Sequence, residues 1–254
     1  MIRGFYTARS GLINHQENMN IISNNMANVN TTGYKPMRAS FTDLMYQNLN
    51  RNTAENTAQV GHGLKINKTD IQMNMGPLEP TSSMLDVAIL EEGAFFAAQG
   101  ADGEIRYTRA GNFSLSNDGG DTFYLVTATG DRVLDADGGE IEIEFLTVND
   151  IKSGDYLGAA VGDMNFDPSE IGVYRFSNPY GLHAIGGNRF VATPESGEPE
   201  ALEEPKIKVS FLEGSGVEMA SEMVKVIESS KAFNFSARMV QVADEVEQTV
   251  NSLR

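Results

Sequence analysis

The stretch FYTARSGLINHQENMNIISNNMANV, residues 5–29, decides the architecture of this chain. Its apolar side chains recur at alternating steps of three and four residues, and one histidine interrupts the series. The series comprises Phe5, Ala8, Leu12, His15, Met19, Ile22, Met26 and Val29. A repeat of 3.5 residues puts these side chains on one seam of a helix, which is then buried against another helix. We therefore predict an N-terminal helix from about Ile2 to Asn30 that needs a helical partner.

The other end of the chain repeats this pattern. Its seam comprises Met219, Met223, Val226, Ser230, Phe233, Ala237 and Val240, and it continues, slightly shifted, through Ala243, Val246, Val250 and Leu253. Two such seams predict that the ends pack on each other or on another copy of the chain. The candidate assembly interface comprises Phe5, Leu12, Met19, Ile22, Met26, Val29, Met223, Val226, Phe233, Val240, Val246, Val250 and Leu253.

The polar face of the first predicted helix is rich in amides. Between Gly11 and Asn30 the only charged residue is Glu17, whereas seven residues are asparagines: Asn14, Asn18, Asn20, Asn24, Asn25, Asn28 and Asn30. Amides can form hydrogen bonds across a packed interface without the desolvation cost of a charge. We expect this helix to be enclosed on more than its apolar seam; the alternative is a frayed, asparagine-rich arm.

The pattern of residues 61–214 predicts β-structure. Short alternating or β-rich segments are separated by Asp/Gly turn clusters, without amphipathic helices between them, which favours an antiparallel sandwich or barrel-like domain. The predicted strands lie within Leu64–Met73, Leu85–Leu90, Ala94–Gln99, Arg106–Arg109, Phe123–Val126, Glu140–Phe145 and Gly172–Phe176. The predicted class is α+β, with long terminal helices pairing as a coiled-coil-like module around an antiparallel β-rich central domain.

The predicted domain boundaries follow from these patterns. Residues 1–36 and 215–254 form a discontinuous helical assembly module, 37–60 a linker or extension, and 61–214 the β-rich domain. Gly33 can take a left-handed conformation at the exit of the first helix, and Pro36 follows it. Ser215 is a plausible N-cap of the second helix, with Glu218 three residues further on.

Composition excludes several functional classes. The 254 residues carry a net charge of −16, which lies in residues 61–214, and no basic cluster of the kind that binds nucleic acid is present. No apolar run is long enough to span a bilayer, and the N-terminus has no apolar signal-peptide core, so we expect neither membrane insertion nor a cleaved signal. The absence of cysteine excludes disulfides and thiolate metal sites.

The sequence contains no residue pattern typical of a catalytic, cofactor or metal site. His15, His62 and His183 are far apart and have no partner at ligand spacing. The acidic run from Asp135 to Gly139 lacks the oxygen ligands of a calcium loop and is better explained as a hairpin turn. We therefore expect no enzymatic activity and no cofactor.

The sequence resembles the flagellar rod and hook family of bacterial axial proteins. The run ANVNTTGYK, residues 27–35, resembles the family's N-terminal signature, which here comprises Ala27, Asn28, Asn30, Thr32, Gly33, Tyr34 and Lys35. Residues 82–112, 175–199 and 217–254 are similar to later blocks of the family, in the same order. The length suits a rod subunit and is short for a hook protein.

The resemblance implies a structural subunit of the basal-body rod, distal or proximal, that polymerises through its terminal helices into a shaft transmitting torque. It implies partners among copies of itself and other axial proteins of the rod and hook, and the flagellar export apparatus. It implies an extracytoplasmic location, in the periplasm or cell-wall zone, after export without a signal peptide. In the polymer, Tyr34 and Lys35 would lie where neighbouring subunits meet.

Two alternatives remain open at this point. One is a hook or junction protein built from the same module. The other is an acidic β-domain glycan hydrolase with helical oligomerisation arms, which would require a cleft with convergent carboxylates.

Overall fold

The computed structural model describes residues 2–48, 59–117, 123–143 and 168–253. Within these residues the chain divides into two compact units, and both are discontinuous in sequence. Unit 1 comprises Met1–Val29, Met37–Gln72 and Val217–Arg254, and unit 2 comprises Asn30–Pro36 and Met73–Gly216. The fold is α+β, with one long helix near each terminus and an antiparallel β-rich central region.

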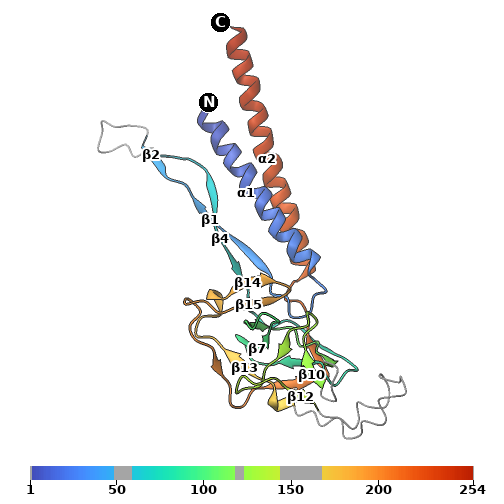
Figure 1. The fold of residues 1–254 in the computed structure, drawn as a ribbon. Helices are drawn as coiled ribbons and strands as arrows, with labels where there is room; N and C mark the ends of the chain where they lie inside the picture. The colour runs from blue at the N-terminus through green and yellow to red at the C-terminus, as the bar shows by residue number, and fades with distance from the viewer. Residues whose placement is uncertain (1, 49–58, 118–122, 144–167, 254) are drawn as a thin grey trace. The chain divides into compact units, whose positions relative to one another are not determined.

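Unit 1 is built on the two terminal helices, α1 (Ile2–Ala27) and α2 (Met219–Ser252). They lie side by side and run antiparallel, blue and red in Figure 1. α2 is the longer, with 34 residues against 26. At a rise of about 1.5 Å per residue, α2 is roughly 12 Å longer than α1. The N-cap of α2 is Glu218 and not the predicted Ser215, which is buried three residues before it.

An antiparallel ribbon made of two successive strand pairs completes unit 1. The first pair is β1 (Met37–Asp43) with β4 (Leu64–Ile71), and the second is β2 (Tyr46–Asn48) with β3 (Gln59–Gly61). Both β1 and β4 contact α1, which lies beside the ribbon in Figure 1. A ribbon of two strands is marginally stable alone, so this packing on a helix accounts for its order.

The described part of unit 2 contains the remaining strands and two single 3₁₀ turns, Pro168–Glu170 and Pro179–Gly181. The strands are β5 (Leu78–Pro80), β6 (Val87–Ile89), β7 (Ala94–Gln99), β8 (Ile105–Thr108), β9 (Ser114–Asn117), β10 (Phe123–Val126), β11 (Arg132–Val133), β12 (Glu142–Ile143), β13 (Val173–Arg175), β14 (His183–Gly186), β15 (Arg189–Val191), β16 (Glu200–Ala201), β17 (Ile207–Val209) and β18 (Phe211–Glu213).

The main sheet of unit 2 has ten strands, and every pair in it is antiparallel. Its principal path runs β12–β10–β11–β7–β8–β15–β14, while β13 pairs with β7 and β16, and β9 pairs with β10. Two short pairs accompany it, β17 with β6 and β18 with β5. The predicted strand at 94–99 is β7, and it lies near the middle of this path.

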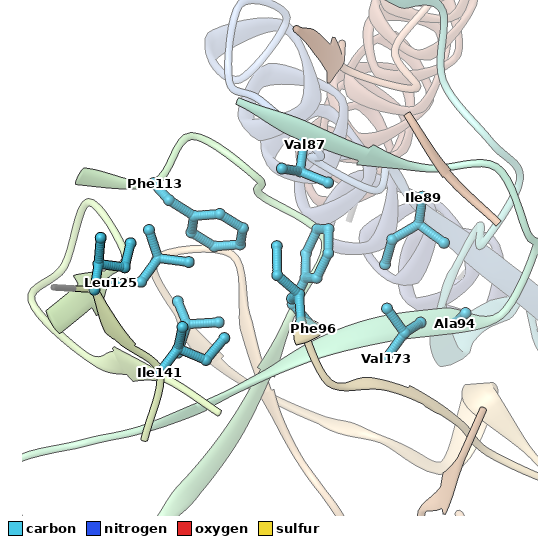
Figure 2. Packing of buried hydrophobic residues seen from close by; sticks show 11 residues of the cluster. Val87, Ile89, Ala94, Phe96, Phe113, Leu125, Ile141 and Val173 are labelled. Atoms are coloured by element: carbon cyan, nitrogen blue, oxygen red, sulfur yellow. The ribbon is translucent and has the colours of Figure 1, made fainter. Parts of the chain in front are cut away.

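The core of unit 2 is a cluster of buried apolar side chains. Phe96 packs edge-on against Phe113, with ring centroids 5.1 Å apart, and aliphatic side chains from several strands surround the pair (Figure 2). The cluster comprises Val87, Ile89, Ala94, Phe96, Phe113, Leu125, Val133, Ile141, Ile143, Ile171 and Val173. A core of this kind stabilises a domain without contributions from outside it.

One predicted boundary was wrong. The β-rich unit begins at Met73 and not at residue 61, because β4 pairs with β1 and packs on α1. Of the two options for residues 37–60, a linker or an extension, residues 37–48 are an extension of paired strands, because β1 finds its hydrogen-bonding partner in β4. Helix α1 ends at Ala27, within a few residues of the expected end at about Asn30. The remainder of the predicted linker, 49–58, lies outside the described residues.

The predicted turn at Asp135 to Gly139 is a hairpin. The Asp135 N–H donates to the Gly139 carbonyl at 2.8 Å, and Leu134 and Glu140 form a bridge on either side. Gly138 has a φ of +83°, the left-handed conformation that such a turn uses. No group of three metal-ligating side chains occurs in the described part of the chain.

Candidate assembly site

The helix pair buries a seam with heptad spacing, but not quite the predicted one. On α2 the inward positions are Glu222, Val226, Ser229, Phe233, Ser236, Val240 and Ala243. On α1 they include Ala8, Gly11, His15, Asn18, Ile22 and Asn25. Alternate members of both rows are small or polar, a feature that a search for apolar side chains alone could not find.

The predicted interface residues divide into two groups. Buried or half-buried are Leu12, Met19, Ile22, Met26, Val29, Val226, Phe233 and Val240. Exposed are Phe5, Met223, Val246, Val250 and Leu253. Burial is therefore consistent with the central part of the predicted seam, which remains a prediction as an interface, while the end of α2 has its apolar side chains in solvent.

A second row of apolar side chains lies on α2 away from α1. Phe235 is 67% exposed and Leu253 is 83% exposed. We call this row the outer α2 stripe; it comprises Val224, Phe235, Met239, Val242, Val246 and Leu253. At about 100° per residue these side chains gather on one side of the helix, beside the inward row and outside it. A helix that is apolar on two sides is typically buried on both.

Two asparagines of α1, Asn14 and Asn25, bind the backbone of the ribbon strands. Asn25 Nδ2 donates to the Met37 carbonyl at 2.8 Å, and the Met37 N–H donates to Asn25 Oδ1 at 2.9 Å. Asn14 forms the same pair of hydrogen bonds with β4: it donates to the Leu64 carbonyl and accepts from the Ile66 N–H. Each carboxamide therefore forms the two backbone hydrogen bonds that a neighbouring strand would form at the edge of the ribbon. The expectation that α1 is enclosed beyond its apolar seam holds in part: Asn14 and Asn25 contact the ribbon, whereas Asn20, Asn24 and Asn30 are exposed.

The signature segment that follows α1 is held against the segment that precedes α2. Within unit 2, the Gly33 N–H donates to the Glu213 carbonyl at 2.7 Å, and the Gly216 N–H donates to the Tyr34 carbonyl at 2.9 Å. Gly33 has a φ of +65°, as predicted, and a Cβ there would lie 2.7 Å from the Arg109 carbonyl carbon. Both the conformation and the close approach require glycine at this position.

A buried ion cluster lies beneath this crossing. Glu213 is 1% exposed and accepts from Lys35 Nζ at 2.6 Å, Arg109 Nε at 2.7 Å and the Gly76 N–H at 2.7 Å. Arg109 also donates to the carbonyls of Glu91 and Ala94. Three segments far apart in sequence therefore converge on one carboxylate.

The charges set the protonation of this cluster. Burial alone would raise the Glu213 pKa, but Arg109, Lys35 and the Gly76 N–H outweigh it and hold that pKa below its ordinary value. Burial lowers the pKa of Lys35, which the Glu213 carboxylate only partly offsets. The resulting group is a fully hydrogen-bonded structural site with no opening toward a substrate.

The other members of the signature have different environments. Ala27 and Asn30 are exposed, Asn28 and Thr32 are half-buried, and Asn188 Nδ2 donates to the Thr32 carbonyl. Tyr34 and Lys35 were expected at a contact between subunits, but both side chains are buried within their own chain. The partner of Lys35, Glu213, was missed together with Arg109, which also binds Glu213, because a single Glu before a Gly-Ser-Gly turn gives no indication of burial in the sequence.

Among the residues that the structure describes, no histidine belongs to a group of metal-ligating side chains. His15 lies at the helix seam, where burial lowers its pKa, and its ring is 6.0 Å from that of Phe41. His62 Nδ1 is 2.8 Å from the Met45 carbonyl. No helix in the described residues is both long and apolar enough to cross a membrane.

Comparison with protein families finds three matches along the chain. The family model described as "Flagella basal body rod protein" matches residues 5–35, which include α1 and the signature. That described as "Flagellar hook protein FlgE/F/G D1 domain" matches residues 88–155, and "Flagellar basal body rod FlgEFG protein C-terminal" matches residues 208–253. The first and last cover both helices and the segments that cross beside Glu213.

Relatives match over the whole length. The "Flagellar basal-body rod protein FlgG" of Borreliella burgdorferi is 35% identical over 100% of this chain and 99% of its own. The protein of that name from Bacillus subtilis is 32% identical over 100% of both chains. The "Flagellar hook protein FlgE" of Borreliella burgdorferi is 35% identical, but over only 46% of this chain and 28% of its own. The chain belongs to the family of flagellar basal-body rod proteins, and it is a structural subunit of the rod rather than an enzyme.

Proposed function

We propose that the chain polymerises through its terminal helices into a helical axial shaft that transmits torque. Unit 1 is the assembly module in this proposal, and unit 2 is a self-contained domain attached to it. The helices of neighbouring copies pack in coiled-coil fashion, so that each copy contributes a helix pair to a continuous wall. Such contacts join unlike surfaces of two copies, and contacts that do not close into a ring generate a filament.

The observation that carries the proposal is the outer α2 stripe. An ordinary surface helix has polar side chains outside its buried face, whereas α2 has Phe235, Met239 and Val242 exposed outside its inward row. Burying one such side chain contributes about 1.5 to 3 kcal/mol, so the row is a strong driving force once a matching surface is present. The residues beyond Ala243 support this, since Val246 and Val250 are exposed near the helix end.

Charge distribution agrees with this arrangement. The segments of the two helices are near-neutral, while the acidic side chains concentrate in residues 61–214. Packed subunits would bring many copies of the helices together without strong charge repulsion, and the acidic units would remain in solvent. We assign the partners accordingly: copies of this chain along the shaft, and other axial proteins of the rod and hook at its ends.

The proposal includes export and location. The subunit passes through the flagellar export apparatus without a cleaved signal and assembles outside the cytoplasmic membrane, in the periplasm or cell-wall zone. A marginal helix pair fits this route, because a chain must be unfolded to pass through a narrow channel. A hook or junction role is less well supported, since the hook relative shares only 28% of its length with this chain.

The test places a charge on the outer α2 stripe. We expect Phe235→Asp and Val242→Asp to abolish polymerisation of the purified subunit and motility of a complemented strain, because a carboxylate would be buried without a partner. Both side chains are exposed in the subunit, so its circular dichroism should not change. Gln241→Asp, an exposed position of the same helix outside the stripe, is the matched control and should assemble normally. Normal assembly of both stripe variants would overturn the proposal.

A further inference from the structure

The seam between α1 and α2 contains hydrogen-bonding pairs at a regular spacing. Asn25 Nδ2 donates to Glu222 Oε2 at 3.3 Å, and Asn18 Nδ2 donates to Ser229 Oγ at 2.6 Å. Asn18 precedes Asn25 by seven residues in α1, and Ser229 follows Glu222 by seven residues in α2. Equal and opposite steps of this kind are what an antiparallel pair of helices produces.

A third pair continues the series one heptad further along. A Cβ at Gly11 would lie 2.9 Å from Ser236 Oγ, so these two residues face each other at close range. We call the three pairs the register pairs; they are Asn25–Glu222, Asn18–Ser229 and Gly11–Ser236. The next step of seven residues brings Gly4 and Ala243 to equivalent positions. The combined size of the side chains falls steadily along the series.

Between the register pairs the inward rows are mostly apolar. The intervening residues are Ile22 with Val226, His15 with Phe233, and Ala8 with Val240, paired by their spacing. Apolar layers of similar size can slide past one another or accept another helix at little cost. The hydrogen-bonding layers cannot, because a buried amide or carboxylate facing an apolar side chain loses its partner.

We propose that the register pairs are specificity determinants of helix pairing. They select the chain's own α2 as the partner of α1, in one antiparallel register, and so leave the outer α2 stripe for other contacts. A slip by one heptad would place Asn25 opposite Ser229 and leave Glu222 without Asn25. Polar residues at single seam positions fix register and partner choice in coiled coils in this way. The proposal concerns pairing within one chain and does not depend on polymerisation.

The Asn18–Ser229 pair is the one to alter. Asn25 also binds the Met37 backbone and Glu222 also binds Lys225, so changes there would disturb other contacts. Two variants separate polarity from packing. Asn18→Leu with Ser229→Leu makes the layer apolar, whereas Asn18→Ser with Ser229→Asn exchanges the two side chains and keeps a hydrogen-bonding layer of the same composition.

The readout is cross-linking between engineered cysteines, since the chain has none of its own. One full-length protein carries Gly4→Cys and Ala243→Cys, which are in register. Another carries Gly4→Cys and Val250→Cys, one heptad displaced. A thiol reagent shorter than one heptad of helix, about 10 Å, distinguishes the two registers. Denaturing electrophoresis then separates products within one chain from products between chains.

In the protein with native Asn18 and Ser229, we expect the in-register cysteines to cross-link at least about tenfold faster than the displaced ones. The slipped register would leave a buried polar group without its partner, which costs about 1 to 3 kcal/mol. The leucine variant should lose most of this preference and form more products between chains, without losing helix content. The exchanged variant should keep the preference. A control with Asn20→Leu and Lys231→Leu, both exposed, adds the same apolar bulk and should also keep it.

Three results would overturn the proposal. The first is a ratio of in-register to displaced cross-linking rates near one in the protein with native Asn18 and Ser229. The second is an unchanged ratio in the leucine variant, and the third is a ratio near one in the exchanged variant. Loss of helix content in the leucine variant would also contradict it, because replacing a buried polar pair by apolar side chains should leave the helices as stable or more so.

Discussion

The two units of this chain are stabilised in different ways. Unit 2 has a contiguous core in which Phe96, Leu125 and Val133 are inaccessible to solvent, and its buried charges are fully paired. In unit 1 the buried positions include Asn25, Glu222 and Ser229, while large apolar side chains of α2 are exposed. A domain that buries polar groups and exposes apolar ones is incomplete by itself. We therefore expect unit 2 to fold alone and unit 1 to be covered by neighbouring copies in the proposed assembly.

The largest effect is expected from removing the carboxylate at the centre of the ion cluster. Glu213→Ala would leave Lys35 and Arg109 as buried cations without their anion, and we expect unit 2 to lose about 3 to 5 kcal/mol of unfolding free energy. Urea unfolding followed by near-ultraviolet circular dichroism of the buried Tyr107 measures this. Glu200→Ala, an exposed strand residue of the same unit, should change the free energy by less than about 0.5 kcal/mol. Similar values for the two variants would show that the cluster does not stabilise unit 2.

A smaller effect is expected at the signature glycine. Gly33→Ala places a Cβ on a left-handed backbone, which costs about 1 to 2 kcal/mol, and also against the backbone of Arg109 and Ala110. Gly103→Ala is the matched control, because Gly103 also has a positive φ of +82° but open space around it. The same urea titration should show a clearly larger loss for Gly33→Ala. Equal losses would mean that only conformation, and not close approach, requires glycine at position 33.

The smallest effect concerns pH. The folded-state pKa of Glu213 lies below the ordinary value of 4.5, so the native state binds fewer protons than the unfolded state between these two values. The stabilisation by this carboxylate is therefore complete above about pH 4.5 and is lost as the pH falls through the folded pKa. In Glu213→Gln this dependence is absent. We expect the difference in unfolding free energy between native protein and variant to shrink below pH 4.5, as measured by urea titrations at several pH values. A constant difference would contradict the charged state of Glu213.

The sequence predicted the elements of this fold better than their boundaries. The heptad pattern correctly predicted both helices, and β7 and β10 have the bounds expected from their β-rich composition. β1 was missed because MRASFTD has weak alternation and depends on β4, 21 residues away, for its hydrogen bonds. Ser215 matched a capping pattern, but its burial in unit 2 places it before the helix rather than at its start.

The candidate site was predicted in part, for similar reasons. Periodicity finds apolar side chains, so it found Ile22 and Phe233 but not the polar half of the seam, Asn18 and Ser229. The amide-rich face of α1 did indicate burial. It did not indicate which groups the amides bind, because the backbone groups of distant strands cannot be inferred from the local sequence. Glu213 and Arg109 are adjacent only in the folded unit, 104 residues apart along the chain.

The central claim is that the outer α2 stripe is covered in the assembled shaft and exposed in the subunit. Hydrogen exchange of backbone amides, measured on the full-length subunit and on its polymer, tests this directly. The account predicts that amides of residues 235–250 exchange rapidly in the subunit and become strongly protected in the polymer. Those of β7 and β13 in unit 2 should be protected equally in both states. Equal protection of residues 235–250 in subunit and polymer would contradict it.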